Sequence, residues 1–366
     1  MKVEIVTLQR ITNFGSLLQT YATQEAIHKL GYKTEVIDFV PEGITFKRAL
    51  FPKGQSKLLK IIIKFIPLLV VNLYQFYMVD KFLKDHVVLT PKKFSSYDQL
   101  SNDCPDADIY LSGSDQIWNT QNNNPEKDIM AYYLCFVPNE KKRVAYASSF
   151  GKTSFEVGEK QNIKKWLHKY DMISVREEIA LDILCSLGID TGVYVADPTL
   201  LLSREEWRRL ANKKLPEIGY VFVYNLNRNK VVETLACLIA KERGLRVVNF
   251  ADTFEFIKGA ENRMFNTPID FINYIANAEF VITDSYHGTV FSLKFGRQFL
   301  TVPAPKYNCR LESILEKTEL LNTRYIKTIE EGIRALETEI DYSIVDPILE
   351  RFISYSFEFL QNALGG

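Results

Sequence analysis

Short apolar runs alternate with helical patterns along nearly the whole chain, and this alternation constrains the fold most. The apolar runs are rich in β-branched residues, as are strands buried on both faces of a parallel sheet. The first series of expected strands is Val3–Leu8, Thr34–Phe39, Asp108–Ser112, Arg143–Ser149, Met172–Arg176 and Val193–Ala196. Helical spacing predicts helices between them over Phe14–Leu30, Asn162–Lys169 and Glu177–Leu187. Such a βαβ alternation predicts an α/β fold with a parallel sheet.

A second series of the same kind begins after about residue 202. Its expected strands are Gly219–Leu226, Arg246–Phe250, Glu279–Thr283 and Phe299–Pro303. Its expected helices are Val231–Arg243, Ile269–Ala278, Thr289–Phe295 and Leu311–Leu320. The segment 197–203 is typical of a crossing between two Rossmann-like halves. We therefore expect an N-terminal domain over 1–202 and a C-terminal domain over 203–340, which suits a chain of 366 residues.

A last helix is expected from about Asp346 to Ala363. Asp346 can cap this helix, and Pro347 suits its first turn. Its apolar stripe predicts that the segment 341–366 packs back across a domain.

Region 45–95 interrupts the alternation with a helical, basic and apolar stretch. Lys57, Lys60 and Lys64 alternate with aliphatic residues, and an uncharged run over Phe65–Val79 follows. This run has fifteen residues and is too short to span a bilayer. One interpretation is a helical insertion packed on the sheet. The alternative is an interfacial patch that docks on anionic lipid.

The charge balance and the cysteines exclude several classes of protein. Lys and Arg number 45 and Asp and Glu number 45, so the chain lacks the basic footprint of a nucleic-acid-binding surface. The five cysteines contain no CxxC pair and suit neither a zinc site nor a disulfide framework. They favour free thiols in a reducing cytoplasm.

Small, polar and glycine residues concentrate where the expected strands end. In an open α/β sheet the ligand crevice lies at the carboxyl ends of the strands, so this pattern predicts an active site. The segments concerned are Thr12-Asn-Phe-Gly-Ser16, Gly113-Ser-Asp-Gln-Ile-Trp-Asn119, Ser148-Ser-Phe-Gly151, Arg176-Glu-Glu178 and Asp284-Ser-Tyr-His-Gly288.

His287 stands apart from the other histidines because it lies between a strand end and a helix start. Gly288 allows a close backbone approach, and Asp284 could orient the imidazole. The helix expected to begin near residue 288 offers N–H groups to an anion. A catalytic or anion-binding role competes here with a plain helix cap.

Two further polar residues each allow two interpretations. Arg176 could pair with Glu177 or Glu178, or its guanidinium could grip a carboxylate or phosphate. Asp115 could shape an Asx turn or accept a proton from a hydroxyl. The segment Asp106-Ala-Asp108 imitates a metal-binding DxD motif, but it lies at the amino end of its strand, so we predict no metal site.

Six blocks in order resemble the polysaccharide pyruvyl transferase family, over roughly residues 1–320. They are Asn13-Phe-Gly-Ser-Leu-Leu-Gln19, Gly113-Ser-Asp-Gln-Ile-Trp-Asn119, Tyr146-Ala-Ser-Ser-Phe-Gly151, Ile173-Ser-Val-Arg-Glu-Glu178, Asp197-Pro-Thr-Leu-Leu-Leu202 and Asp284-Ser-Tyr-His-Gly288. The resemblance implies two Rossmann-like domains in a glycosyltransferase-B-like fold, with the acceptor on the N-terminal side and the donor on the C-terminal side. It also implies transfer of the enolpyruvyl unit of phosphoenolpyruvate onto a sugar of a surface or capsular polysaccharide precursor, as a ketal, with release of phosphate.

The resemblance places the family's histidine at His287 and a donor-binding arginine at Arg176, with Arg310 of Tyr307-Asn-Cys-Arg310 as the alternative. We hypothesise that His287 is the acid or a phosphate ligand and that Asp115 helps to deprotonate the acceptor. The residues expected to bind substrate are Arg176, Asn13, Gly15, Ser114, Ser285, Gly288 and Arg310. Ketal formation needs an acid, cations and a base, but neither a metal nor a nucleotide cofactor.

The expected partners are phosphoenolpyruvate and a sugar acceptor. The basic and apolar patch at 57–79 motivates the hypothesis of a lipid-linked oligosaccharide acceptor and of a cytoplasmic enzyme that visits the inner membrane face. Two rival functions stay open: a sugar-nucleotide glycosyltransferase of the same fold, and a non-catalytic glycan-assembly protein that has kept it.

Overall fold

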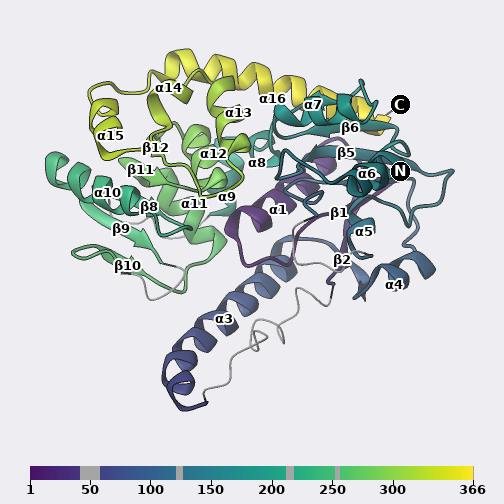
Figure 1. The fold of residues 1–366 in the computed structure, drawn as a ribbon, viewed down its shortest axis with the longest axis horizontal. Coiled ribbons are helices and arrows are strands. Elements are labelled where there is room, and N and C mark those ends of the chain that lie inside the picture. Colours follow the sequence, from purple (N-terminus) through teal and green to yellow (C-terminus); the bar gives the residue numbers. More distant parts are fainter. Residues whose placement is uncertain (42–57, 121–126, 212–217, 252–255, 366) are drawn as a thin grey trace. The chain divides into compact units, whose positions relative to one another are not determined.

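The computed structural model describes residues 1–41, 58–120, 127–211, 218–251 and 256–365, without the side chains of 58–68 (Figure 1). The described chain divides into two units, Met1–Leu201 with Ile353–Gly366, and Leu202–Phe352. Each unit is an α/β structure built on its own parallel sheet, so the predicted pair of Rossmann-like folds is confirmed.

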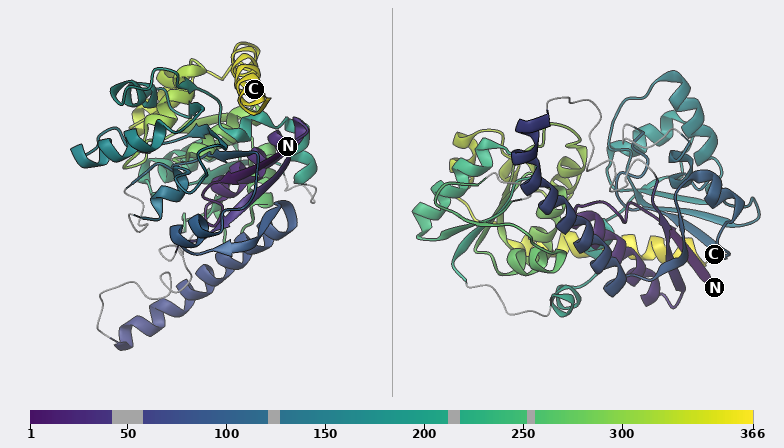
Figure 2. Two further views of the ribbon diagram at one scale, coloured as in Figure 1. Left: turned by 90° about the vertical axis from the view of Figure 1, so that its right-hand side faces the viewer. Right: turned by 90° about the horizontal axis from the view of Figure 1, so that it is seen from below.

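The first unit contains a seven-stranded sheet in the order β3-β2-β1-β4-β5-β6-β7, with every pair parallel. Helices lie on both faces of this sheet (Figure 2). Its elements are β1 (Lys2–Val6), α1 (Phe14–Lys29), β2 (Lys33–Phe39), α3 (Leu58–His86), β3 (Leu89–Phe94), α4 (Tyr97–Asn102), β4 (Ile109–Ser112), α5 (Ile129–Tyr132), β5 (Lys142–Ser148), α6 (Val157–Leu167), β6 (Met172–Val175), α7 (Ile179–Ser186), β7 (Val193–Tyr194) and α8 (Pro198–Leu201).

The second unit contains a five-stranded parallel sheet in the order β10-β9-β8-β11-β12. Its elements are α9 (Arg204–Leu210), β8 (Tyr220–Tyr224), α10 (Lys230–Arg243), β9 (Arg246–Phe250), β10 (Glu261–Arg263), α11 (Pro268–Asn277), β11 (Phe280–Thr283), α12 (Tyr286–Phe295), β12 (Gln298–Thr301), α13 (Cys309–Lys317), α14 (Leu321–Arg324), α15 (Ile329–Ala335) and α16 (Tyr342–Gly365). Helix α16 runs through residues of both units.

The strand order of each sheet reverses once, between β1 and β4 in the first unit and between β8 and β11 in the second. The chain moves outward in one direction from β1 and in the other from β4, so the loops that follow these two strands diverge. In doubly wound sheets, ligands bind at the carboxyl ends of the strands at such a switch point. The motif-bearing loops after β1, β4 and β11 therefore lie where this architecture places ligands.

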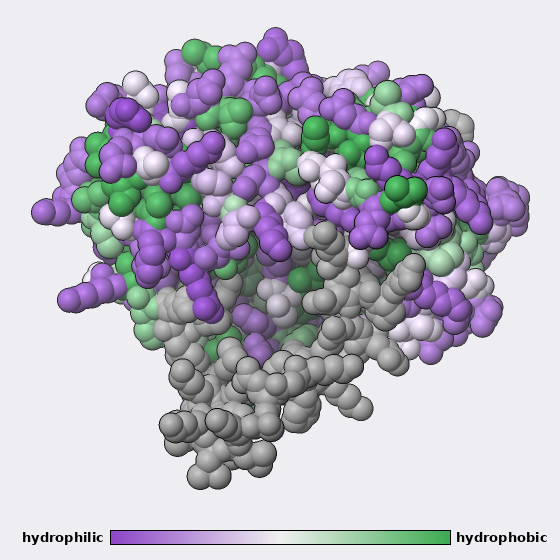
Figure 3. Space-filling model, in the orientation of Figure 1, coloured by the Kyte–Doolittle hydropathy of each residue, from purple (hydrophilic) through white to green (hydrophobic). Residues whose placement is uncertain are grey.

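The central strands are as apolar as the sequence predicted, and they form the two cores. Val3, Ile5, Leu111 and Val144 are completely buried in the first unit. In the second unit Val221, Ile282 and Leu300 belong to one buried cluster. Hydrophilic residues cover most of the face drawn in Figure 3, as the charged composition requires.

Two edge strands were missed because their sequences lack an apolar run. Strand β3 contains Pro91 and two lysines, and it lies within the region 45–95 that was predicted to be helical. Strand β10 is the polar tripeptide Glu-Asn-Arg. Short, charged or proline-containing strands are common at sheet edges, where they discourage pairing with other chains. The remaining part of the region is the long helix α3, while 45–57 lie outside the described residues.

The predicted start of the last helix is wrong by one turn. Helix α16 begins at Tyr342, and Pro347 lies inside it. The Ser343 amide donates to the Asp341 carboxylate at 2.9 Å, so Asp341 rather than Asp346 satisfies the first turn. Asp346 instead accepts a hydrogen bond from Arg204 Nη2 at 2.8 Å.

Candidate functional site

The start of helix α1 is fixed by Asn13, which follows the loop after β1. Its side chain accepts hydrogen bonds from the amides of Gly15 at 2.9 Å and Ser16 at 3.3 Å. Asn13 is therefore the N-cap of α1, a role that satisfies two amides at a helix start. A substrate-binding role for Asn13 and Gly15 stays a prediction.

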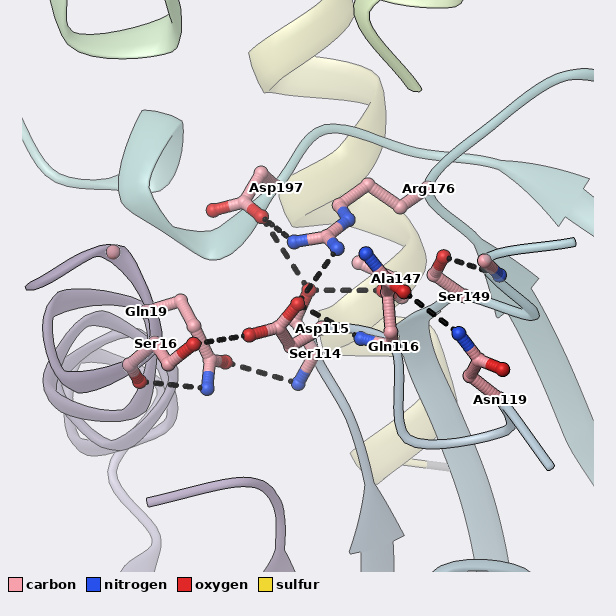
Figure 4. Close-up of polar contacts among 12 residues, drawn as sticks. Ser16, Gln19, Ser114, Asp115, Gln116, Asn119, Ala147, Ser149, Arg176 and Asp197 are labelled. Carbon is pink, nitrogen blue, oxygen red and sulfur yellow. Dashed lines mark hydrogen bonds and ion pairs between the residues drawn. The ribbon is translucent and has the colours of Figure 1, made fainter. Parts of the chain in front are cut away.

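Asp115 lies at the switch point of the first unit, and its carboxylate accepts several hydrogen bonds. Its carboxylate accepts hydrogen bonds from Ser16 Oγ at 2.5 Å, Arg176 Nη2 at 3.0 Å and the Gln116 amide at 2.8 Å (Figure 4). Its backbone has a φ of 78°, which is uncommon outside glycine and best tolerated by Asn and Asp. The loop therefore fixes the carboxylate in one orientation beside helix α1.

Arg176 follows β6 and joins two carboxylates. Its Nη1 donates to Asp197 Oδ2 at 2.7 Å and its Nη2 donates to Asp115, while its side chain is completely buried. Glu177 accepts from Ser149 Oγ at 2.8 Å and from the Phe150 amide at 3.1 Å, and a pairing of Arg176 with Glu177 or Glu178 stays a prediction. The group therefore contains one guanidinium and two carboxylates.

Asp115, Arg176 and Asp197 form a group that we call the first cluster, and Ser114 and Gly113 lie next to it. The Ser114 hydroxyl donates to Ala147 O at 2.9 Å and lies 3.5 Å from Asp197 Oδ2, and the Ser114 amide donates to Gln19 Oε1 at 3.1 Å. A Cβ on Gly113 would lie 2.0 Å from Tyr146 O, so the close approach of β4 and β5 here requires glycine.

Three residues in or next to this cluster were not selected from the sequence, although all stand in the motif blocks. They are Ser16, Gln19 and Asp197. Asp197 was given no role of its own in the crossing segment or in its motif block, yet its Oδ1 also accepts from Thr199 Oγ1 at 2.7 Å and from the Thr199 amide at 3.0 Å. The signal available in the sequence was an acidic residue directly before Pro198 and Thr199.

His287 lies inside the first turn of helix α12, because this helix begins at Tyr286 and not at residue 289 as predicted. Ser285 is the N-cap, and its hydroxyl accepts from the Gly288 amide at 3.4 Å. A Cβ on Gly288 would lie 2.5 Å from Thr283 Oγ1, so packing against β11 requires glycine at this position. The imidazole is held at the positive end of the helix dipole.

Asp284 bridges the switch point of the second unit. Its carboxylate accepts from the amides of Leu226 at 2.7 Å and Asn227 at 2.8 Å, and from the Asn227 side chain at 2.9 Å. Burial raises the pKa of this carboxyl, and the hydrogen bonds oppose that effect. Asp284 thus ties the loop after β8 to the loop after β11, while its predicted contact with His287 stays a prediction.

Arg310 and His287 both lie next to the ring of Tyr286. The Arg310 guanidinium lies 5.4 Å from the centroid of the Tyr286 ring, and the His287 ring lies 5.2 Å from the same ring. Arg310 belongs to the first turn of α13 and is only partly buried. The second cluster therefore joins an imidazole, a guanidinium and a helix N-terminus, all of which favour an anion.

The described residues contain no group of three or more His, Cys, Asp and Glu side chains that could hold a metal ion. Asp106 and Asp108 of the DxD-like segment are engaged with Lys141 and with the Lys2 amide. Within the same residues, no helix is long and apolar enough to cross a membrane.

The model of one protein family, polysaccharide pyruvyl transferase, matches residues 13–303. The chain belongs to the polysaccharide pyruvyl transferase family. The match contains every candidate site residue of the pyruvyl transferase pattern except Arg310, which lies beyond its end. No curated protein sequence matches the chain significantly.

Two solved structures of UDP-N-acetylglucosamine 2-epimerases share this fold at low sequence identity. A putative UDP-N-acetylglucosamine 2-epimerase from Listeria monocytogenes is 11% identical, with a TM-score of 0.54 over 99% of this chain and 90% of that one. The UDP-GlcNAc 2-epimerase from Neisseria meningitidis is 10% identical, with a TM-score of 0.52 over 100% and 99%. At this identity the likeness establishes the glycosyltransferase-B-like fold alone.

Proposed function

We propose that the protein transfers the enolpyruvyl unit of phosphoenolpyruvate onto a sugar of a polysaccharide precursor, forms a pyruvate ketal and releases phosphate. The observation that carries this proposal is the different make-up of the two clusters. Arg176 is neutralised by Asp115 and Asp197, whereas His287 and Arg310 flank a helix N-terminus. The first cluster suits a neutral hydroxyl, and the second suits an anionic donor.

In this proposal the donor binds to the second cluster. Arg310 presents a planar fork of N–H donors that matches a carboxylate or phosphate in two parallel hydrogen bonds. The first-turn amides of α12 add donors that are aligned with the helix dipole. Arg310, and not Arg176, is then the main ligand of phosphoenolpyruvate.

The reaction begins with a proton on the methylene carbon of the donor. His287 donates this proton, which converts the methylene to a methyl group and makes C2 an oxocarbenium-like centre. A sugar hydroxyl oxygen attacks C2, the bond from C2 to the phosphate oxygen breaks, and a second hydroxyl closes the ketal. Both hydroxyl protons are lost in these steps: the first passes to Asp115, and the second passes to the released phosphate.

Arg176 acts in this account as a positioning residue. One guanidinium nitrogen donates to Asp115 and the other donates to Asp197. The buried guanidinium therefore fixes the orientation of the Asp115 carboxylate. A general base needs this kind of fixed direction to meet the hydroxyl that it deprotonates.

Phosphate release from phosphoenolpyruvate in the presence of candidate sugars tests the proposal. We expect phosphoenolpyruvate, and not UDP-N-acetylglucosamine, to raise the melting temperature by binding the native state. We also expect a matching sugar to stimulate phosphate release. Stabilisation by the nucleotide sugar alone, without phosphate release, would favour a glycosyltransferase. Stabilisation by neither would favour a non-catalytic protein.

We further propose that the acceptor is lipid-linked and that helix α3 contacts an anionic membrane surface. Val70, Leu73 and Tyr77 are exposed on α3 at a spacing that places them on one helical face. Lys60 and Lys64 precede this face along the same helix, and Lys57 lies outside the described residues. An apolar stripe beside basic residues is typical of interfacial helices.

A further inference from the structure

A cavity of about 830 Å³ lies in the first unit, apart from the Asp115 cluster. Described residues of the loops after β4 and β5, of helix α5 and of one face of helix α6 line it. Its lining residues are Thr120, Ile129, Lys152, Ser154, Phe155, Glu156, Gly158, Glu159, Asn162 and Trp166. We propose that this cavity binds a neutral pyranose ring of the acceptor glycan, an inference that rests on the proposed function.

One wall of the cavity is an anchored aromatic ring. Trp166 packs against Tyr133 with ring centroids 4.9 Å apart, and Tyr133 stacks on Trp118 at 5.6 Å with the planes only 10° apart. Trp118 and Tyr133 are completely buried, whereas Trp166 is partly exposed. The indole is therefore held from behind while it lines the cavity. A fixed indole offers an apolar surface with a polar edge, which suits the C–H face and the hydroxyls of a sugar ring.

The sequence of α6 places polar groups beside this ring. Glu159, Asn162 and Trp166 are spaced by three and four residues, so they share one face of the helix, and all three line the cavity. Carboxylate, amide and ammonium groups supply the acceptors and donors that sugar hydroxyls require. A polar helix face next to an aromatic ring combines the two features that a sugar needs.

The charges of the cavity favour a neutral ligand. Lys152 forms an ion pair with Glu159, and the Thr120 hydroxyl donates to the same carboxylate. The Lys152 ammonium also lies 4.7 Å from the centroid of the Phe155 ring. Because the cation is already paired, a phosphate or carboxylate would have to displace Glu159, whereas a hydroxyl can bond to both groups.

The cavity and Asp115 share the same two loops. Thr120 lies five positions after Asp115 along one loop, and Lys152 follows Gly151 in the other. The loops meet closely, since a Cβ on Gly151 would lie 2.4 Å from Gln116 Oε1 and 2.7 Å from Asn119 Nδ2. The Trp118 amide also donates to Ser149 O at 3.1 Å. A glycan bound in the cavity is therefore held by the loops that aim the proposed base.

Intrinsic fluorescence gives a direct test, because Trp166 is the solvent-accessible one of the chain's three tryptophans. Trp118 and Trp207 are completely buried. The probes are methyl glycosides of glucose, galactose, mannose and N-acetylglucosamine, together with disaccharides of these sugars. We expect at least one probe to change the fluorescence saturably, and Trp166→Phe to abolish the change. Failure of every probe to change the emission overturns the inference, whatever the phosphate assay shows.

Kinetics separate this inference from the proposed function. With a sugar that stimulates phosphate release, we expect Trp166→Ala to raise the KM for the sugar about tenfold or more and to leave the KM for phosphoenolpyruvate unchanged. Lys160→Ala, at an exposed position of α6 outside the cavity lining, is the matched control. If Trp166→Ala releases phosphate at the wild-type rate with an unchanged KM for the sugar, the cavity assignment is contradicted and the proposed function is not. Absence of release with every sugar counts against the proposed function, while the fluorescence result still decides the cavity.

Discussion

Arg176 Nη1 lies 2.7 Å from Oδ2 of Asp197, and both side chains are inaccessible to solvent. Asp115 completes the group at 3.0 Å from Nη2. Two carboxylates and one guanidinium buried together hold the loops after β4, β6 and β7 in one arrangement, and the proposed base belongs to this arrangement.

Removal of Arg176 should destabilise the protein strongly, because it leaves two buried carboxylates without their cation. We expect Arg176→Ala to lower the free energy of unfolding by about 3–5 kcal/mol, and Arg176→Lys to lower it less, since a lysine keeps the charge without the fork. Urea denaturation measures both values. Lys81→Ala, which breaks the exposed pair with Asp85, should leave the free energy of unfolding nearly unchanged. A cost below about 1 kcal/mol for Arg176→Ala contradicts the structural role given to this residue.

Gly288 should not tolerate a side chain. Thr283 Oγ1 lies 2.5 Å from the position of an added Cβ, and it already donates to Tyr224 O at 2.6 Å and accepts from the Ser285 amide at 3.0 Å. We expect Gly288→Ala to cost about 1–3 kcal/mol in the free energy of unfolding, because Thr283 cannot move aside freely.

The matched control for Gly288 is Gly158, which lies in the first turn of α6 and has open space around an added Cβ. Gly158→Ala should raise the free energy of unfolding by about 0.5–1 kcal/mol, since alanine favours the helix. Equal stabilities of the two variants in urea denaturation argue against the described packing of α12 on β11.

Glu4 should make stability depend on pH. Burial raises its pKa to about 7 from an ordinary value of 4.5, against the effect of the ion pair with Lys2 at 2.8 Å. Between these two pH values the native state holds a proton that the unfolded chain has lost, so this group's contribution to stability falls as the pH rises from about 4.5 to about 7. The slope is at most about 1.4 kcal/mol per pH unit.

Glu4→Gln isolates this effect because it removes the titrating group. The free energy of unfolding of the variant minus that of the wild type should increase from pH 5 to pH 7 and then level off. Other buried carboxyls, such as Asp284, contribute equally to both proteins and cancel. Parallel pH profiles of the two proteins rule out the raised pKa.

Helix α3 gives a separate prediction for membrane contact. Replacement of Leu73 and Tyr77 by glutamate should abolish flotation with vesicles that contain anionic lipid, because it removes apolar area and adds like charge. Both residues are exposed, so the substitutions should leave the fold intact. Flotation of the double variant at the wild-type level contradicts the proposed docking of α3.

The sequence predicted the elements well where buried, β-branched strands carried a strong pattern, as in Arg246–Phe250. It missed β3 and β10, which lie at sheet edges. Strand β3 contains Pro91 and β10 is the polar segment Glu261–Arg263, so neither has a buried, β-branched pattern. The strand orders, and with them the two switch points, depend on long-range pairing that local periodicity does not contain. The motif blocks placed Asp115 and Arg176 at strand ends, but only tertiary structure reveals that Asp197, 21 positions further on, is the partner of Arg176.

The binding of phosphoenolpyruvate to single variants tests the central claim most directly. Isothermal titration calorimetry should give a Kd for Arg310→Ala at least about tenfold above that of the wild type, because the variant loses a guanidinium that grips the donor. Asp115→Asn should bind phosphoenolpyruvate within about threefold of the wild type and yet lose phosphate release. An unchanged Kd in Arg310→Ala, with loss of binding in Asp115→Asn, would contradict the account.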